Sequence, residues 1–283
     1  MSHLDRILAC NRHELARYRP FLIGGRRVGW IRRDRHEQLA ARPDLFVERD
    51  DTVHLTAPGG FGERSAALAV FVGSLAEAGQ IGEIRGEMFA VAPSFTAPPL
   101  AQIDRAALPW FGVRGFGVHL NGYVRRDGQL WMWVARRARD KPNCPGMLDQ
   151  IVAGGQPIDL GLRDNLAKEC TEEAGIPADL AARAHAVGAV SYCGENDVGL
   201  KPDTLFCFDL ELAEDFAPRN TDGEVDAFEL WPIGAVTDTV RETDEFKGNC
   251  NLVVLDFLIR HGVIAETEPD YLEIVAGLRA PLP

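Results

Sequence analysis

Apolar and polar positions alternate in short blocks along the first 93 residues, and this pattern predicts a small α+β region. Apolar residues at helical spacing between residues 3 and 17 place Leu4, Ile7, Leu8 and Leu15 on one side of a helix. Two short apolar runs on either side of Gly24 predict a hairpin. The same reading predicts a short helix at 34–40, strands at 46–47 and 53–55, a helix at 63–77 and a strand at 88–91.

The rest of the chain alternates over longer stretches, which predicts a larger mixed sheet. Residues 113–126 and 130–136 fit two antiparallel strands joined at Asp127-Gly128. Prolines at 93, 98, 99 and 109 mark a linker ahead of them. We therefore expect an α/β (α+β) fold with an N-terminal domain at 1–110 and a larger domain at 111–283. Other predicted elements there are strands at 148–152, 187–192, 204–212 and 225–231, and helices at 179–184 and 251–261.

One stretch, residues 154–176, carries the clearest chemistry. A glycine pair leads into a helix whose buried side is marked by Leu162, Leu166 and Cys170, and Gly175 ends it. Glu169, Glu172 and Glu173 share one face of its last turns, where the helix dipole is negative and like charges repel by about 0.2–0.5 kcal/mol per pair. A bound hard cation such as Mg²⁺ or Mn²⁺ would reverse these terms. The alternative is a solvated acidic face.

The charge balance argues against one class of partner. The 283 residues contain 42 acidic and 30 basic side chains, a formal charge of -12. Nucleic acid partners usually require a basic face, so we expect no nucleic acid partner. A small anionic substrate stays compatible with this charge, because a metal ion can supply local positive charge.

The six cysteines are scattered and form no Cys-x-x-Cys pair, which predicts reduced thiols. Residues 1–6 lack the features of a signal peptide, and no apolar run reaches membrane-spanning length; the longest covers residues 66–76. We therefore expect a cytoplasmic protein with no membrane partner.

The 154–176 stretch resembles the signature box of the Nudix hydrolases. That box runs Gly, five residues, Glu, seven residues, Arg-Glu, an apolar residue, any residue, Glu-Glu, any residue, Gly and an apolar residue. Gly154 and the run from Glu169 to Ile176 fit in register, whereas Leu160 replaces a Glu and Lys168 replaces an Arg. Segments 118–124, 145–149, 222–225 and 256–262 resemble a thiamine-pyrophosphokinase-related subgroup with an extra N-terminal domain.

The resemblance implies an α/β/α sandwich and a metal-dependent hydrolase of a diphosphate, with Mg²⁺ or Mn²⁺ held by Glu169, Glu172 and Glu173. Divalent metals neutralise phosphate oxygens and make hydroxide available near neutral pH. In the family the residue at Lys168 holds the glutamates. Glu224 is a candidate further acid, as ligand or general base, in competition with Asp222, Asp226 and Glu229.

Residues for the substrate are predicted less directly. Gly154 and Gly155 suit close backbone approach to a phosphate or a positive φ, and a simple turn is the alternative. Tyr192, like Trp110, Trp131 and Trp133, could stack on a substrate ring, although aromatic residues in strands usually belong to the core. The polar segment 193–197 follows a predicted strand and could border the pocket.

The subgroup resemblance points to thiamine diphosphate, or its oxo or oxy form, as a substrate that yields the monophosphate. A nucleotide-type diphosphate is the alternative substrate. A non-catalytic binding protein is the alternative class; Leu160 and Lys168 favour it, and the three intact glutamates argue against it. Three roles stay open for the N-terminal domain: covering the active site, forming a homodimer, or packing only.

Overall fold

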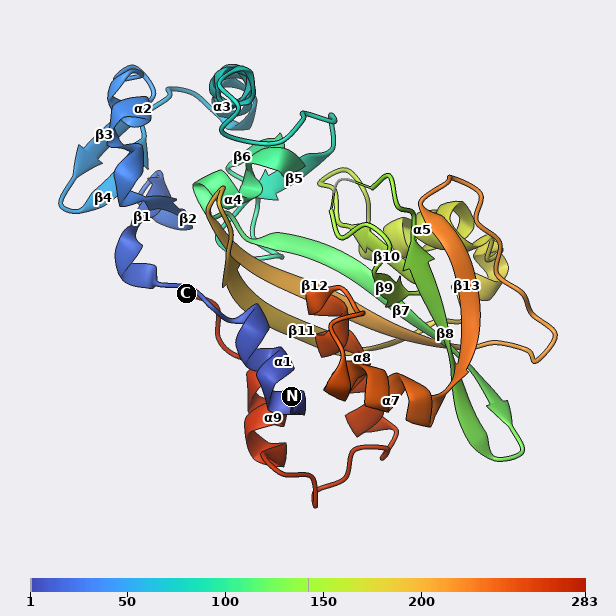
Figure 1. Cartoon of the computed structure of the whole chain (residues 1–283). Coiled ribbons are helices and arrows are strands. Elements are labelled where there is room, and N and C mark those ends of the chain that lie inside the picture. Colours follow the sequence, from blue (N-terminus) through green and yellow to red (C-terminus); the bar gives the residue numbers. More distant parts are fainter. Residues whose placement is uncertain (1, 142) are drawn as a thin grey trace.

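The centre of the molecule is a mixed sheet in which β12 (Leu200–Glu211) and β7 (Gly115–Arg126) run parallel while the other pairs are antiparallel. The computed structural model describes residues 2–141 and 143–283. The strands follow the order β11-β12-β7-β8-β13, and two short strands, β9 and β10, pair with β8 and β7 (Figure 1). The remaining strands of the sheet are β8 (Gln129–Arg137), β9 (Leu148–Gln150), β10 (Val152–Gly155), β11 (His185–Glu195) and β13 (Val225–Pro232).

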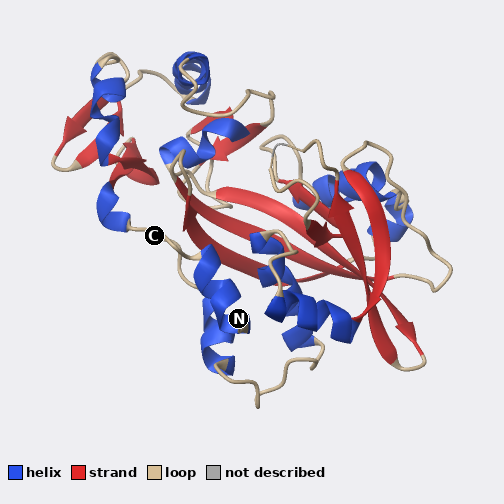
Figure 2. Ribbon diagram, viewed as in Figure 1, coloured by secondary structure: helices blue, strands red, loops and turns tan. Residues whose placement is uncertain are grey.

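Helices cover both faces of this sheet. Each strand can pack against both helix layers because its successive side chains point to opposite faces. On one face, Val118 and Leu120 of β7 pack with Leu166 of α5 (Leu162–Ala174), near the short α6 (Ala178–Ala181). On the other face, Met132 and Val134 of β8 pack beneath α8 (Gly248–Arg260). The helices α1 (His3–Cys10), α7 (Ile233–Glu242) and α9 (Tyr271–Gly277) complete this second layer. The predicted α/β/α sandwich is confirmed (Figure 2).

Residues 21–113 contribute to a separate core centred on aromatic side chains. Phe21, Phe46, Phe71, Trp110 and Phe111 lie within 4.7–6.4 Å of one another in contacting ring pairs. Around them lies a sheet of order β2-β1-β4-β3, a β5–β6 hairpin and helices. The elements are β1 (Tyr18–Ile23), β2 (Arg26–Arg32), α2 (His36–Ala40), β3 (Phe46–Arg49), β4 (Thr52–Leu55), α3 (Phe61–Glu77), β5 (Met88–Val91), β6 (Ala101–Asp104) and α4 (Leu108–Phe111).

Two expectations for the N-terminal residues are wrong. The helix predicted to reach residue 17 ends at Cys10, because Asn11 caps it and donates its side-chain amide to the Ile7 carbonyl. The proline-marked segment expected to be a linker contains β6 and α4; Pro109 occupies the first turn of α4, where a missing N–H costs nothing. The sequence patterns also missed α7 and α9.

Helix α1 packs in the second layer of the sandwich rather than with residues 21–113. Its Ile7 is 3% exposed and belongs to the core beneath α8. Arg6 is also buried, and its Nε donates to the Val240 carbonyl at 2.7 Å while its guanidinium pairs with Asp244. The predicted division at residue 110 therefore does not coincide with the division between these cores.

Between β7, β9 and the start of α8 lies a buried polar network centred on Asp149. The Asp149 carboxylate accepts hydrogen bonds from Lys247 Nζ at 3.2 Å, Arg137 Nη1 at 3.0 Å and Cys250 Sγ at 2.8 Å. His119 Nδ1 lies 2.7 Å from Gln150 Oε1. Burial opposes ionisation of Asp149, but the charge of Lys247 and its neighbours lowers its pKa to about 2. Burial and the same lysine lower the pKa of His119 to about 4.

Three of these groups could in principle ligate a metal, since ligand atoms of His119, Asp149 and Cys250 lie within 4.8 Å of one another. Two cations already neutralise Asp149, and burial raises the pKa of the Cys250 thiol well above its usual value. The polar groups of this network therefore satisfy one another's hydrogen-bonding capacity, and the network links the sheet to α8. All six cysteines, which lie in the described residues, are free thiols. Within residues 2–141 and 143–283, no helix has the length and apolar character needed to cross a membrane.

We predict that Gly112→Ala strongly destabilises the fold. Gly112 ends α4 at φ 55°, and an added Cβ would lie 2.3 Å from the Trp30 carbonyl oxygen. Backbone strain and overpacking together should cost about 3 kcal/mol or more, measured by urea denaturation. Gly128→Ala is the matched control: Gly128 has φ 76° but nothing within 4 Å of the added Cβ, so only about 1 kcal/mol is expected. Equal losses would contradict the close approach.

We also predict that His119 makes the fold sensitive to acid. Its pKa falls from an ordinary 6.5 to about 4 on folding, so its contribution is complete above pH 6.5 and is lost as the pH falls toward 4. The difference in unfolding free energy between pH 7 and pH 4 should shrink by about 3 kcal/mol in His119→Gln. Urea denaturation at both pH values measures it. An unchanged difference in the variant would show that His119 is not buried in its neutral form.

Candidate active site

Two buried polar side chains hold the loop that leads from β10 into α5. Asn165 is 0% exposed, and its Nδ2 donates to the Gly155 carbonyl at 2.7 Å and to Gln156 Oε1 at 3.2 Å. Gln156 Nε2 in turn donates to the Leu160 carbonyl at 2.8 Å. The acceptor in this hydrogen bond is the backbone carbonyl of Leu160. The contact therefore does not depend on which side chain stands at position 160. Sequence reasoning missed both anchors, although their amide side chains beside a glycine loop are a usable signal.

Helix α5 has the orientation expected from its apolar spacing. Leu166, Cys170 and Ala174 are buried, and Gly175 adopts φ 63° at the helix end. Residues from the loop before β13 satisfy the last turn: Arg219 N donates to the Ala174 carbonyl at 2.9 Å, and Thr221 Oγ1 to that of Glu172 at 2.5 Å. These contacts bring the loop that precedes Glu224 onto the acidic end of the helix.

The three acids of α5 have different surroundings. Glu173 is 8% exposed and accepts a hydrogen bond from Ala153 N at 2.7 Å; burial raises its pKa well above the usual range. Burial also raises the pKa of Glu169, and the charges of Glu172 and Glu87 add to this. Glu172 is the exposed member, with its side chain 49% accessible. The structure thus gathers carboxylates whose negative charges disfavour one another.

Lys168 lies against two of these acids. Its Nζ is 3.2 Å from Glu169 Oε1 and 2.7 Å from Glu172 Oε2. Lys168 therefore contacts two of the glutamates that the family resemblance assigns this position to hold. A lysine does so as a point charge, without the bidentate fork of an arginine.

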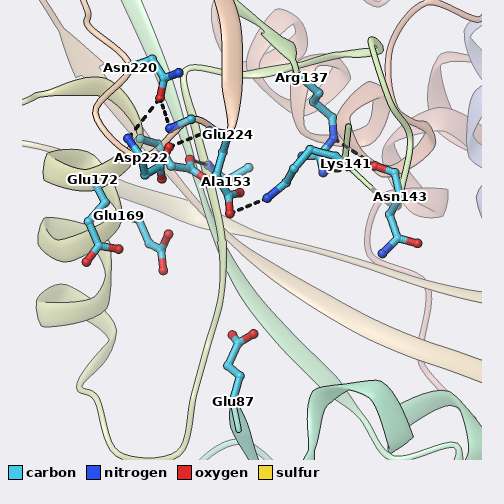
Figure 3. A network of polar contacts seen from close by, with 12 residues as sticks. Glu87, Arg137, Lys141, Asn143, Ala153, Glu169, Glu172, Asn220, Asp222 and Glu224 are labelled. Atoms are coloured by element: carbon cyan, nitrogen blue, oxygen red, sulfur yellow. Dashed lines mark hydrogen bonds and ion pairs between the residues drawn. The ribbon is translucent and has the colours of Figure 1, made fainter. Parts of the chain in front are cut away.

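Glu224 lies across from α5, at the start of β13 (Figure 3). Its Oε1 pairs with Lys141 Nζ at 2.5 Å, and its negative charge adds to the raised pKa of Glu173. Asn220 Oδ1 accepts from Asp222 N and Gly223 N, and Asp222 Oδ1 accepts from Glu224 N, so this turn positions Glu224. Asp222 is thereby engaged in the turn, while Glu229 pairs with Arg136.

Gly154 and Gly155 lie in β10, and the expectation of a positive φ is wrong because both have extended strand geometry. What requires glycine is crowding. A Cβ on Gly154 would lie 2.4 Å from Glu169 Cδ. On Gly155 it would lie 2.8 Å from Glu87 Oε1 and 3.0 Å from Arg105 Nη1. A phosphate was expected to approach this backbone closely. In the structure, the close approach is made by the protein's own side chains.

Tyr192 is not brought to the acids of α5. It is 7% exposed in the core beneath α8, where its hydroxyl donates to Asp203 Oδ2 at 2.9 Å and accepts from Asn249 Nδ2 at 3.1 Å. Trp110 belongs to the separate aromatic core. In segment 193–197, Glu195 pairs with Arg17 at 2.7 Å, so this segment contacts the N-terminal region.

The donor set suits a hard divalent cation. Glu169, Glu172, Glu173 and Glu224 offer carboxylate oxygens, which Mg²⁺ and Mn²⁺ prefer. Burial is the main cause of the raised pKa of Glu169 and of Glu173, and a bound cation would favour the charged form of both carboxylates. The charge of Glu87 also raises the pKa of Glu169, although Glu87 lies outside the larger domain predicted at 111–283. The sequence carries no spacing signal for Glu87, because it lies 82 positions before Glu169.

Comparison with known proteins identifies relatives over nearly the whole chain. "Nudix hydrolase 20, chloroplastic" of Arabidopsis thaliana is 43% identical and covers 97% of this chain and 77% of its own length. "Nudix hydrolase 24, chloroplastic" of the same plant is 43% identical, with coverage of 98% and 77%. A family model described as "Domain of unknown function (DUF4743)" matches residues 2–115. Among solved structures, the Nudix domain of Shewanella oneidensis NrtR with ADP-ribose aligns at 15% identity and a TM-score of 0.42, over 56% of this chain and 94% of that one.

These names correct the cytoplasmic location expected from the sequence, since both plant relatives are named chloroplastic. Free thiols are compatible with any reducing compartment, so they do not separate one such compartment from another. The family itself is confirmed. Identity of 43% over almost all of the chain, and over more than three quarters of each plant relative, makes the chain a member of the Nudix hydrolase family, whose enzymes are pyrophosphohydrolases.

Proposed function

We propose that this protein is a metal-dependent hydrolase that cleaves a small diphosphate by attack of water on phosphorus. The observation that carries the proposal is the placement of Glu169 and the buried Glu173 on α5, with Glu224 opposite them ahead of β13. Burial raises the pKa of Glu173, and the charges of Asp149, Glu169 and Glu224 add to this. Carboxylates gathered at an energetic cost are typical of functional sites. The three intact glutamates of the box also argue against a non-catalytic binding protein.

Mg²⁺ or Mn²⁺, when bound by these glutamates, would neutralise phosphate oxygens and lower the pKa of a water molecule. The chain's own groups prepare that site. Ala153 N orients the Glu173 carboxylate, and the Asn220 turn orients Glu224. Lys168 and Lys141 hold Glu172 and Glu224 by ion pairs that a metal could replace. Glu224 is the acid proposed as further ligand or general base.

For the substrate we propose thiamine diphosphate or an oxidised analogue, hydrolysed to the monophosphate, on the basis of the subgroup resemblance. A nucleotide-type diphosphate is the alternative. Purified protein with Mg²⁺ or Mn²⁺ should be tested against thiamine diphosphate, its oxo and oxy forms, and a nucleotide panel that includes ADP-ribose, with phosphate and product release measured. Turnover of the thiamine compounds at a higher kcat/KM than any nucleotide supports the proposal. Turnover of none of the compounds counts for the non-catalytic alternative.

Glu173→Gln should lower kcat/KM by at least about 10–100-fold. The substitution keeps the size and an acceptor for Ala153 N but removes the negative charge that a metal requires. Steady-state kinetics with saturating Mg²⁺ measure the effect. Glu242→Gln is the matched control, because Glu242 lies on α7 with its side chain 61% exposed. Near-normal activity in Glu173→Gln would remove Glu173 from the metal site.

Gly154→Ala should impair activity more than it impairs folding. The added Cβ meets the end of the flexible Glu169 side chain, which can swing away at small cost but then leaves its position. We expect kcat/KM to fall by about 10–100-fold while the urea midpoint changes little. Calorimetric titration with Mn²⁺ should show weaker metal binding in the same variant. Unaltered Mn²⁺ affinity and activity would mean that Glu169 need not lie over Gly154.

A further inference from the structure

The N-terminal region reaches the acidic site through the open end of the β5–β6 hairpin. Strand pairing sets Met88 opposite Asp104, so Glu87 and Arg105 flank the same end. Arg105 N donates to the Glu87 carbonyl at 2.9 Å, and Arg105 Nη1 pairs with Glu87 Oε2 at 3.0 Å. In Figure 3, Glu87 points from this hairpin toward the region between Glu169 and Glu224.

This pair is seated on the glycine strand of the Nudix box. Glu87 and Arg105 lie over Gly155, and Glu169 lies over the neighbouring Gly154. Ile158 N donates to the Met88 carbonyl at 2.9 Å, which ties the loop before α5 to β5. Farther along the N-terminal region, Phe95 packs on Phe116 and Phe206 of the large sheet, with ring centroids 4.9 and 4.6 Å apart. The hairpin end is therefore held next to the acids by contacts on several sides.

Arg105 is a cation that remains accessible within this acidic surrounding. Its side chain is 55% exposed, although Glu87 holds one of its nitrogens. Partial burial opposes its charge, yet the carboxylates of Glu87, Asp203 and Glu169 raise its pKa. An arginine has five N–H donors, so the pair with Glu87 leaves donors for an anion.

We propose that Arg105, positioned by Glu87, binds a phosphate of the diphosphate substrate, so that the N-terminal region supplies part of the substrate site. This inference rests on the proposed function. A diphosphate bound between α5 and the hairpin would meet the metal-binding glutamates at one end and the arginine fork at the other. Guanidinium groups bind phosphate oxygens bidentately, which fixes orientation as well as charge. Arg105 is thus assigned to binding, and Glu87 is a positioning residue.

The test uses the full-length protein and its best substrate from the panel. Arg105→Gln should raise KM by about 10–100-fold, with a smaller change in kcat, because a charge-assisted phosphate contact is lost. Arg105→Lys should recover part of the loss, since it restores charge without the fork. Glu87→Gln should raise KM less than Arg105→Gln. Arg85→Gln is the matched control: Arg85 lies two residues before Glu87, in the segment that leads into β5, with an exposed side chain, and its KM should equal that of the wild type.

Binding of methylenediphosphonate with Mg²⁺, measured by calorimetry, separates this inference from the proposed function. Weaker binding by Arg105→Gln than by wild type and Arg85→Gln supports the assignment even where no tested compound is hydrolysed. Equal dissociation constants, or no binding by the wild type at millimolar concentration, overturn it. A rise in KM shared by Arg85→Gln also overturns it, because that result indicates a general disturbance of the hairpin. If Arg105→Gln unfolds, Arg105→Lys carries the comparison.

Discussion

Steric crowding at the β10 backbone is the constraint on which the site depends. Two consecutive residues without side chains, Gly154 and Gly155, let the backbone be approached by Glu169 at one residue and by Glu87 and Arg105 at the next. The same strand supplies the Ala153 N–H that fixes Glu173. A side chain at Gly154 would displace Glu169 from its position over the strand, and one at Gly155 would displace Glu87 and Arg105. The strand therefore joins the acidic helix to the N-terminal region.

Charge balance at the site comes from three long side chains on three different segments. Lys168 on α5, Lys141 between β8 and β9, and Arg105 after β6 each pair with at least one carboxylate. The pairs made by Lys168 and Lys141 are partly exposed and individually weak, so a divalent cation can displace them at small cost. Lys168, which replaces the family's arginine, fits this arrangement. Its ammonium group can leave a carboxylate without breaking the bidentate hydrogen bonds that an arginine would make.

Local spacing predicted much of the fold and the placement of three glutamates on one helix, α5. The four-residue repeat of Leu162, Leu166 and Cys170 oriented α5 correctly, and the glycine after the helix marked its end. Long alternating strands likewise predicted the sheet. Tyr192 shows the limit of such patterns: an alternating strand says that a side chain points to one of two faces, but not which face carries the site.

The parts of the site that were missed depend on contacts distant in sequence. Arg105 lies in the segment whose prolines suggested a linker, and strand pairing brings it next to Glu87. Both meet Gly155 only after two cores have packed together. The pairing of Glu224 with Lys141 has the same character. The periodicity of residues within a single helix or strand does not indicate contacts of this kind. Only the resemblance to a family pointed to an acid near position 224.

The placement of α1 changes how the chain can be divided. The chain starts in the layer beneath the large sheet, where Gly277 lets Ile7 approach so closely that a Cβ there would lie 2.4 Å from Ile7 Cγ2. It then leaves to build the aromatic core and returns at β7. The region that forms the aromatic core, residues 21–113, is thus inserted between α1 and β7, two parts of the sandwich, and is connected to the sandwich at both ends. A protein shortened to residues 111–283 would lose a helix of its own core and expose the apolar surface of α8 and α9 that α1 covers.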